Sequence, residues 1–171
     1  MNRLVVVVML AILVSGLAQA QTETQVQPQP QTGEERQFLI YAVAGLARPS
    51  GGDSRFQMGG GAEYFVYKGL SAGGEYSRIK GSDTTGGSNN ISLNGTYHFL
   101  GRDKSQKFDP FATGGYSRFF ASGVGANAMN LGVGINSWLS DGFGLRFDFR
   151  DYEVRGPGRL IGLRGGVVLG F

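Results

Sequence analysis

The stretch Phe143-Gly144-Leu145-Arg146-Phe147-Asp148-Phe149-Arg150 alternates large apolar residues with polar, charged or small ones. Successive side chains of a β-strand point to opposite faces. This spacing therefore gives one face of phenylalanine and leucine and another of arginine, aspartate and glycine. The period of two predicts a strand over residues 143–154, with one face in an apolar environment and the other in a polar one.

The same alternation returns along the chain from Phe38 to Phe171. Turn signals separate eight segments: 38–48, 54–66, 70–79, 89–100, 108–121, 126–139, 143–154 and 159–171. No helical period interrupts the series. An even number of segments places both ends of the series on one side, as an up-and-down barrel requires. The sequence therefore predicts an all-β fold, an eight-stranded antiparallel up-and-down β-barrel.

The composition of the two faces favours a transmembrane β-barrel over a soluble, lipocalin-like barrel. Glycine accounts for 30 of the 171 residues, and charged residues make up only 17%. A soluble barrel would turn many Lys, Glu and Thr side chains to water, whereas the polar face here carries glycines, amides and a few charges of both signs. That face suits a narrow, crowded lumen. Aromatic residues near segment ends are candidates for interfacial girdles: Tyr64, Tyr97, Phe99, Trp138 and Tyr152.

Composition also excludes several classes of function. The chain has no cysteine, which rules out disulfides, thiolate metal sites and a cysteine nucleophile. Its net charge of +3 comes from 16 basic and 13 acidic residues spread along the chain, so no nucleic-acid-binding patch is expected. No cofactor and no metal site are predicted.

The N-terminal residues predict export from the cytoplasm. Arg3 precedes the unbroken apolar run Leu4–Val14, and the small-residue site Ala18-Gln19-Ala20 follows. This pattern predicts a cleaved signal peptide over residues 1–20, because a membrane-spanning helix needs about 20 apolar residues. Residues 21–37 are rich in glutamine and nearly devoid of apolar side chains, which predicts a disordered periplasmic tail. The barrel is assigned to residues 38–171.

The end of the chain resembles a known assembly signal. The sequence Val167-Val168-Leu169-Gly170-Phe171, with alternate apolar residues running back to Ile161, is similar to the C-terminal signal for outer-membrane insertion. The signal residues are Leu163, Val167, Leu169 and Phe171. Residues 38–171 resemble the small eight-stranded Gram-negative outer-membrane β-barrel family, the OmpA/OmpX type often described as porin-family outer membrane β-barrel domains.

The resemblance implies a place in the cell outer membrane and a membrane-structural or surface-interaction role. The partners it implies are outer-membrane lipid, lipopolysaccharide and the barrel assembly machinery. It names no particular surface ligand.

Alternation places six charged residues in the lumen: Glu63, Glu75, Arg146, Asp148, Arg150 and Arg164. Arg118 is a further candidate, although segments 38–48 and 108–121 do not show which of their faces points inward. An eight-stranded barrel is only wide enough for its side chains to fill, and each buried ion needs a partner to offset a desolvation cost of several kcal/mol. We therefore expect an ion-paired, plugged interior, with a narrow channel for small solutes as the alternative.

His98 is the only histidine, and alternation places it in the lumen near the short turns. Histidine suits acid–base catalysis because its ordinary pKa lies near neutrality. The sequence contains no His-x-Ser motif, and no nucleophile–base pair is expected around His98. His98 is therefore predicted to be a hydrogen-bonded structural residue in a protein without enzymatic activity. A lipid-modifying outer-membrane enzyme is the less favoured alternative.

Overall fold

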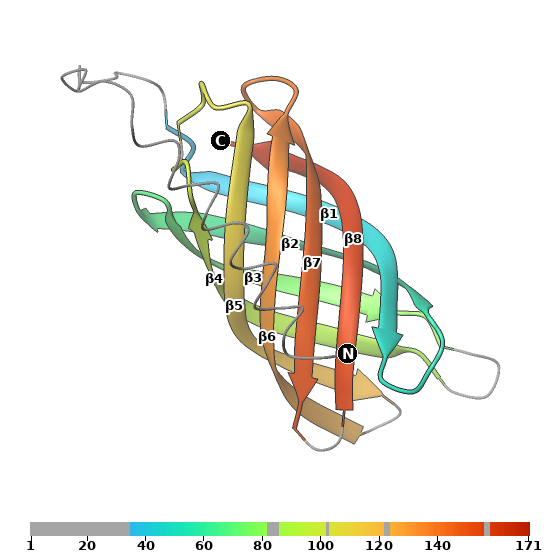
Figure 1. Cartoon of the computed structure of the whole chain (residues 1–171). Helices are drawn as coiled ribbons and strands as arrows, with labels where there is room; N and C mark the ends of the chain where they lie inside the picture. The colour runs from blue at the N-terminus through green and yellow to red at the C-terminus, as the bar shows by residue number, and fades with distance from the viewer. Residues whose placement is uncertain (1–34, 82–85, 102, 122–123, 156–157) are drawn as a thin grey trace, which may run out of the picture. The chain divides into compact units, whose positions relative to one another are not determined.

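A computed structural model of the chain describes residues 35–81, 86–101, 103–121, 124–155 and 158–171. Within them, eight antiparallel strands form one closed barrel in which each strand pairs with the next and β8 pairs with β1 (Figure 1). The strands are β1 (Phe38–Pro49), β2 (Arg55–Tyr67), β3 (Leu70–Ile79), β4 (Ser88–His98), β5 (Phe108–Ala121), β6 (Val124–Trp138), β7 (Phe143–Val154) and β8 (Gly158–Gly170). The predicted fold is confirmed, and every strand boundary lies within two residues of the predicted one. No helix among the described residues is long and apolar enough to span a membrane.

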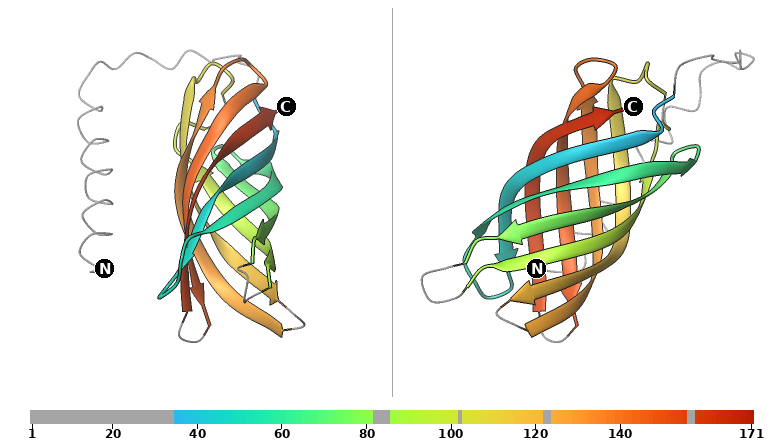
Figure 2. Two further views of the ribbon diagram at one scale, coloured as in Figure 1. Left: turned by 90° about the vertical axis from the view of Figure 1, so that its right-hand side faces the viewer. Right: turned by 180° about the vertical axis from the view of Figure 1, so that it is seen from behind.

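The two ends of the barrel carry different connections. The first residue of β1 and the last of β8 lie together at one end, here called the terminal end, where the Phe171 amide donates to the Phe38 carbonyl at 2.9 Å (Figure 2). The β2–β3, β4–β5 and β6–β7 turns lie at this same end. The other four connections define the loop end, so the even number of strands brings both ends of the barrel segment together as expected.

Side chains alternate between lumen and outer face along every strand. On β6, Asn130 and Asn136 are buried, whereas Leu131 between them is 70% exposed. The structure also settles the two segments whose faces the sequence leaves open. Inward residues are Leu39, Tyr41 and Val43 on β1, and Asp109, Phe111, Thr113 and Ser117 on β5.

The lumen is filled in three layers. An apolar cluster lies toward the terminal end and comprises Leu39, Tyr41, Val43, Phe65, Trp138 and Val168. A second apolar cluster lies toward the loop end and comprises Ala47, Ile79, Ala128, Tyr152 and Leu160. The buried charged side chains of β3, β7 and β8 lie between these clusters, whereas His98 and Asp109 lie near the terminal ends of β4 and β5. Apolar side chains therefore lie on both sides of the central ion pairs.

Glycine permits close strand contact where β1 meets β8. A β-carbon at Gly45 would lie 2.0 Å from the Leu163 carbonyl oxygen, and one at Gly166 would lie 1.9 Å from that of Ala42. No side chain fits at such a distance, so any other residue would push the two strands apart. These positions show how the high glycine content serves the closure of a small barrel.

The N-terminal predictions are only partly covered by the described residues. The predicted signal peptide, residues 1–20, lies outside them, as do residues 21–34 of the predicted tail. Glu35 forms a β-bridge with Asp103, and the Gln37 amide donates to the Phe171 carbonyl at 2.5 Å. The prediction of disorder is thus wrong for residues 35–37, which attach to the terminal end of the barrel.

Candidate functional site

The structure brings all six charged residues predicted for the lumen into its polar layer. Each is at most 3% exposed: Glu63, Glu75, Arg146, Asp148, Arg150 and Arg164. They come from β2, β3, β7 and β8, and their side chains meet across the interior. Buried charges at this density must be neutralised by one another.

Arg164 on β8 connects two carboxylates from different strands. Its Nη1 lies 2.5 Å from Glu75 Oε1 on β3, and its Nε lies 2.8 Å from Asp148 Oδ1 on β7. The Tyr41 hydroxyl donates to the other Glu75 oxygen at 3.1 Å. Arg150 Nη2 lies 3.6 Å from that oxygen. The Asp148 contact joins neighbouring strands. The contacts of Glu75 with Arg164 and Arg150 span the lumen, because β3 is not adjacent to β7 or β8.

Arg146 on β7 forms a second crossing. Its Nη2 donates to Glu63 Oε1 on β2 at 2.9 Å. The guanidinium carbon lies 4.1 Å from the ring centroids of both Tyr41 and Phe111. Stacking on aromatic faces suits a planar, weakly hydrated guanidinium, so the two rings replace part of the water that this cation loses.

Amide and hydroxyl side chains extend the network toward the loop end. Arg150 Nη1 donates to Asn130 Oδ1 at 3.0 Å, and Asn130 Nδ2 donates to Asn94 Oδ1 at 3.0 Å and to Ser117 Oγ at 2.9 Å. Further along, Gln57 donates to the Ser77 hydroxyl at 3.1 Å. These side chains fill the space between the ion pairs and the apolar cluster at the loop end.

His98 has partners that sequence reasoning did not find. Its Nδ1 lies 2.8 Å from Asp109 Oδ2, and its Nε2 lies 3.2 Å from Glu63 Oε2 and 3.4 Å from Ser71 Oγ. The expectation that no serine lies within hydrogen-bonding distance of His98 is therefore wrong. The fold places Asp109, His98 and Ser71 in a row, with Asp109 at one ring nitrogen and Ser71 at the other.

The surroundings of this cluster oppose nucleophilic catalysis. The Ser71 hydroxyl donates a hydrogen bond to Glu63 Oε2 at 2.9 Å. A serine nucleophile would instead donate its hydrogen bond to the histidine that acts as its base. Ser71 and His98 are each 1% exposed. A carboxylate at each ring nitrogen suits an imidazolium, which is the only form that donates from both nitrogens. The contacts indicate a further buried ion pair.

With His98 as imidazolium, the charges of the polar layer balance. The positive groups are Arg146, Arg150, Arg164 and His98, and the negative groups are Glu63, Glu75, Asp109 and Asp148. Asp109 is the acid that the sequence does not assign to the lumen. The layer therefore needs no counterion from solvent.

Arg36 covers the terminal end of the lumen. Its guanidinium carbon lies 3.7 Å from the Trp138 ring centroid, and Nη1 donates to the Asp103 carbonyl at 2.9 Å. Nε donates to the Asp141 carbonyl at 3.2 Å. Burial lowers the pKa of the Arg36 guanidinium, although nearby carboxylates oppose the shift. This residue explains why the end of the predicted tail is ordered.

Two of the five aromatic residues predicted for interfacial girdles point into the barrel instead. Trp138 is 7% exposed and Tyr152 is fully buried. Each lies an even number of residues from a buried residue of its own strand, Asn136 or Arg150, and alternation then fixes its side. Proximity to a strand end does not determine the face. The remaining three lie on the outer face: Tyr64, Tyr97 and Phe99.

Arg118, the further candidate for the lumen, lies on the outer face. Its neighbours Ser117 and Phe119 point inward, so alternation turns Arg118 outward. Its Nη1 donates to Asn127 Oδ1 at 3.3 Å, and its guanidinium carbon lies 5.5 Å from the Phe120 ring centroid. The interpretation of Arg118 as a lumen residue is wrong.

The residues of the C-terminal signal form an exposed apolar row along β8: Leu163, Val167, Leu169 and Phe171. Across the described ranges, no group of three or more metal-ligating side chains has the arrangement of a metal site.

Solved structures with the same fold are outer-membrane and designed barrels. The N-terminal β-barrel domain of Pseudomonas aeruginosa OprF matches with 17% identity and a TM-score of 0.59, over 81% of this chain and 100% of that one. Neisserial surface protein A matches with 19% identity and a TM-score of 0.61, over 78% and 97%. A de novo designed transmembrane β-barrel matches with 15% identity and a TM-score of 0.56, over 82% and 100%.

These likenesses define the class of fold, which is that of the small eight-stranded outer-membrane β-barrels. A designed barrel matches about as well as the natural ones, so the likeness carries the architecture and no particular activity. No protein-family model matches the chain, and no curated protein matches it significantly.

Proposed function

We propose that the protein is a non-enzymatic outer-membrane β-barrel with a plugged interior, in a membrane-structural or surface-interaction role. The observation that carries this proposal is the ion-paired layer across the lumen, in which Arg164 joins β8 to β3 and Arg146 joins β7 to β2. An apolar outer face supports a membrane environment, since Leu131 and Leu163 expose more than two thirds of their surface.

Electrical recording tests the plugged interior directly. The folded protein in a planar bilayer should give no steady current above the leak of the lipid alone. A heat-modifiability gel on the same preparation verifies that the barrel is folded. Stepwise single-channel currents from folded protein would contradict the plugged interior and support the alternative of a narrow channel for small solutes.

The proposed location places the terminal end in the periplasm and the loop end outside the cell. The signal peptide predicted over residues 1–20 supports export, and the exposed apolar row on β8 supports recognition by the barrel assembly machinery. Deletion of Phe171 should reduce the heat-modifiable fraction in outer membranes, whereas Phe171→Tyr, which keeps the aromatic ring, should assemble. Equal assembly of the deletion variant would remove the support for this signal.

The absence of enzymatic activity is tested at the His98 cluster. Purified folded protein should release no fatty acid from phospholipid or lipopolysaccharide, because Ser71 is buried and donates to Glu63. Acyl release by the wild-type protein that disappears in Ser71→Ala would overturn the non-enzymatic proposal and support a lipid-modifying enzyme.

A further inference from the structure

The outer face has its own pattern of charge. Every outward-facing charged residue of the strands lies toward the loop end: Arg48, Arg78, Arg118, Asp151, Glu153 and Arg159. Lys80 and Arg155 follow β3 and β7 directly at the same end. Basic residues outnumber acidic ones in this rim, so it attracts anions.

The cations of this rim differ in their partners. Arg159 forms a bidentate ion pair with Asp151, and Arg118 donates to Asn127. The side chains of Arg78 and Lys80 have no hydrogen-bond or ion-pair partner in the part of the chain that the structure describes. Both are exposed and lie two residues apart, so they point from the same face of β3. Among the described residues, no carboxylate forms an ion pair with either of these two positive charges.

A groove in the outer face leads to this pair. Small outward residues form its floor, with Ala44 paired to Gly165 on β8 and Ala42 paired to Gly60 on β2. Met58 and Tyr76 form one wall, and Arg78 lies beside Met58 at the loop end. The hollow measures about 510 Å³.

A second hollow of about 210 Å³ shares Met58 and Arg78 and continues to Lys80. Together they form what we call the β1–β3 groove.

The dimensions of the groove suit one leaflet of a bilayer. From Tyr76 to Lys80 the strand advances four residues, or about 13 Å at roughly 3.3 Å per residue. At the strand tilt of about 40° of such barrels, this spans about 10 Å along the membrane normal. Half of a hydrocarbon core is about 15 Å thick. An acyl chain in the apolar trough would therefore bring its headgroup to the height of Arg78 and Lys80, where a phosphate offers the complementary charge.

A second copy of the chain fits the groove less well. In an isologous contact the same patch faces itself, which would bring Arg78 and Lys80 of both copies together. Like charges facing each other in an interface are costly. The charge at the end of the groove therefore favours an anionic occupant over a partner barrel.

We propose that the β1–β3 groove binds a phosphorylated lipid of the surrounding leaflet, with one acyl chain along Ala42 and Ala44 and the phosphate between Arg78 and Lys80. This inference rests on the proposed placement of the barrel in a membrane. It does not depend on whether the lumen conducts.

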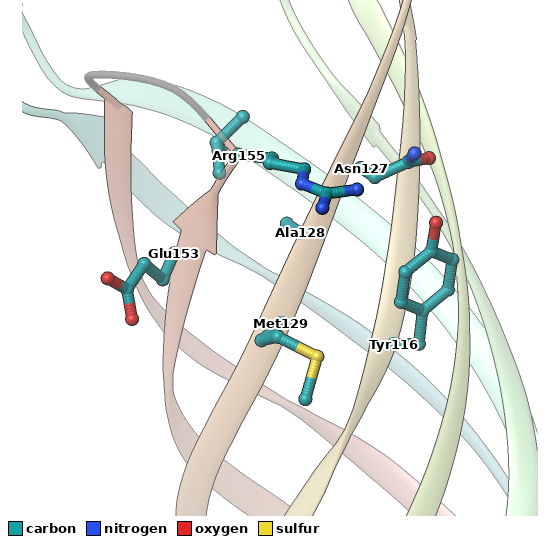
Figure 3. Close-up of a pocket in the computed structure, with 7 residues that line it drawn as sticks. Tyr116, Asn127, Ala128, Met129, Glu153 and Arg155 are labelled. Atoms are coloured by element: carbon teal, nitrogen blue, oxygen red, sulfur yellow. The ribbon is translucent and has the colours of Figure 1, made fainter.

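Another outer-face hollow near the loop end provides a comparison. It measures about 450 Å³ and includes Tyr116, Asn127, Met129, Glu153 and Arg155. In Figure 3 the Arg155 side chain extends over Ala128 toward Asn127, and Glu153 lies on the β7 side of the same hollow. The lining contains the Glu153 carboxylate as well as the Arg155 guanidinium, so this hollow carries less net positive charge than the β1–β3 groove.

The experiment compares lipid retention by folded full-length protein in detergent, followed by native mass spectrometry during titration with phosphatidic acid. The double variant Arg78→Gln/Lys80→Gln should bind phosphatidic acid about tenfold more weakly, which corresponds to the loss of about 1.4 kcal/mol. Its matched control, Arg118→Gln/Arg155→Gln, removes the same charge from the rim and should bind as the wild type does. Diacylglycerol, which has the acyl chains without phosphate, should be retained weakly by every variant.

A groove variant tests the acyl chain. Ala44→Leu fills the trough without changing charge and should reduce retention of phosphatidic acid, whereas Ala72→Leu, at an exposed position of β3 nearer the terminal end, should not. Equal retention by the Arg78/Lys80 variant and its control, or equal retention of diacylglycerol and phosphatidic acid, would overturn the proposal. A dimer that Ala44→Leu dissociates, with lipid retention unchanged, would overturn it in favour of self-association. Heat modifiability and conductance, read on the same preparations, report separately on the proposed barrel function.

Discussion

The lumen and the outer rim differ in whether their charged side chains have partners within the protein. In the lumen, Arg164 lies 2.5 Å from Glu75 and 2.8 Å from Asp148, and each of the eight ions of the polar layer has an oppositely charged partner. On the outer rim, Arg78 has no such partner among the described residues. A lumen only as wide as its side chains excludes bulk water, so the protein must neutralise its own charges there. The rim meets headgroups and solvent, which can supply the counterions.

Removal of a lumen charge should have the largest effect. Arg164→Gln would leave Glu75 and Asp148 without their shared cation, and loss of one partner of a buried pair costs about 3–5 kcal/mol. We expect the free energy of unfolding to fall by about this amount in urea titrations in micelles, followed by the fluorescence of Trp138, the only tryptophan.

The double variant Arg164→Gln/Glu75→Gln supplies the control for this prediction. It removes both members of one pair, so its destabilisation should be smaller than the sum of the two single effects. Additive energies would show that the two residues do not interact, which would contradict the network as the structure describes it.

Substitution of an apolar residue by arginine in the middle of the outer face should have the next largest effect. Phe147 is 52% exposed on β7, and an arginine at the bilayer midplane costs about 2–4 kcal/mol. We expect Phe147→Arg to lower the free energy of unfolding in lipid vesicles by that amount. Phe143→Arg, at the terminal end of the same strand, should cost about 0–1 kcal/mol because it lies near the interface. Equal costs at the two positions would contradict a membrane across the middle of the barrel.

Substitutions at two glycines, one in the lumen and one on the outer face, should show that the lumen is crowded and the outer face is open. A β-carbon at Gly134 would lie 2.4 Å from Phe111 Cζ and 2.5 Å from the Phe147 carbonyl oxygen, whereas nothing lies within 4 Å of one at Gly95. Overpacking costs about 1–3 kcal/mol, so Gly134→Leu should be destabilised and Gly95→Leu should remain close to the wild type in the same urea titrations. Equal stabilities would show that the lumen has spare volume.

The strands could be predicted from sequence because most of them have one consistently apolar face. On β7 the alternation of Phe147 and Asp148 decides the side of every residue, which places three of the six lumen charges. The same alternation on β2, β3 and β8 places the other three. On β5 both faces mix aromatic and polar residues, since Asp109 and Phe111 point inward while Phe108 and Tyr116 point outward. Periodicity alone does not orient such a strand.

The partners of His98 could not be predicted for that reason. Asp109 lies on the ambiguous strand, and Ser71 lies on β3, 27 residues away in the chain, so no short motif joins them to His98. The order of Arg36 depends on backbone carbonyls of two turns and on the Trp138 ring, which sequence does not place together. A three-dimensional register was needed for both.

The smallest expected effect comes from the ion pair that the rim does form. Arg159 donates to Asp151 through two nitrogens, yet its side chain is 41% exposed. Exposed pairs contribute about 0.2–1 kcal/mol because water and salt screen them. We expect Arg159→Gln to lower the free energy of unfolding by no more than that, and the difference from wild type to shrink further in high salt. Arg164→Gln, with the same change of charge in the lumen, should keep its full effect in high salt because ions do not reach the buried pair. A large, salt-independent effect at Arg159 would mean that the rim is as dry as the lumen, and the contrast between the two regions would then fail.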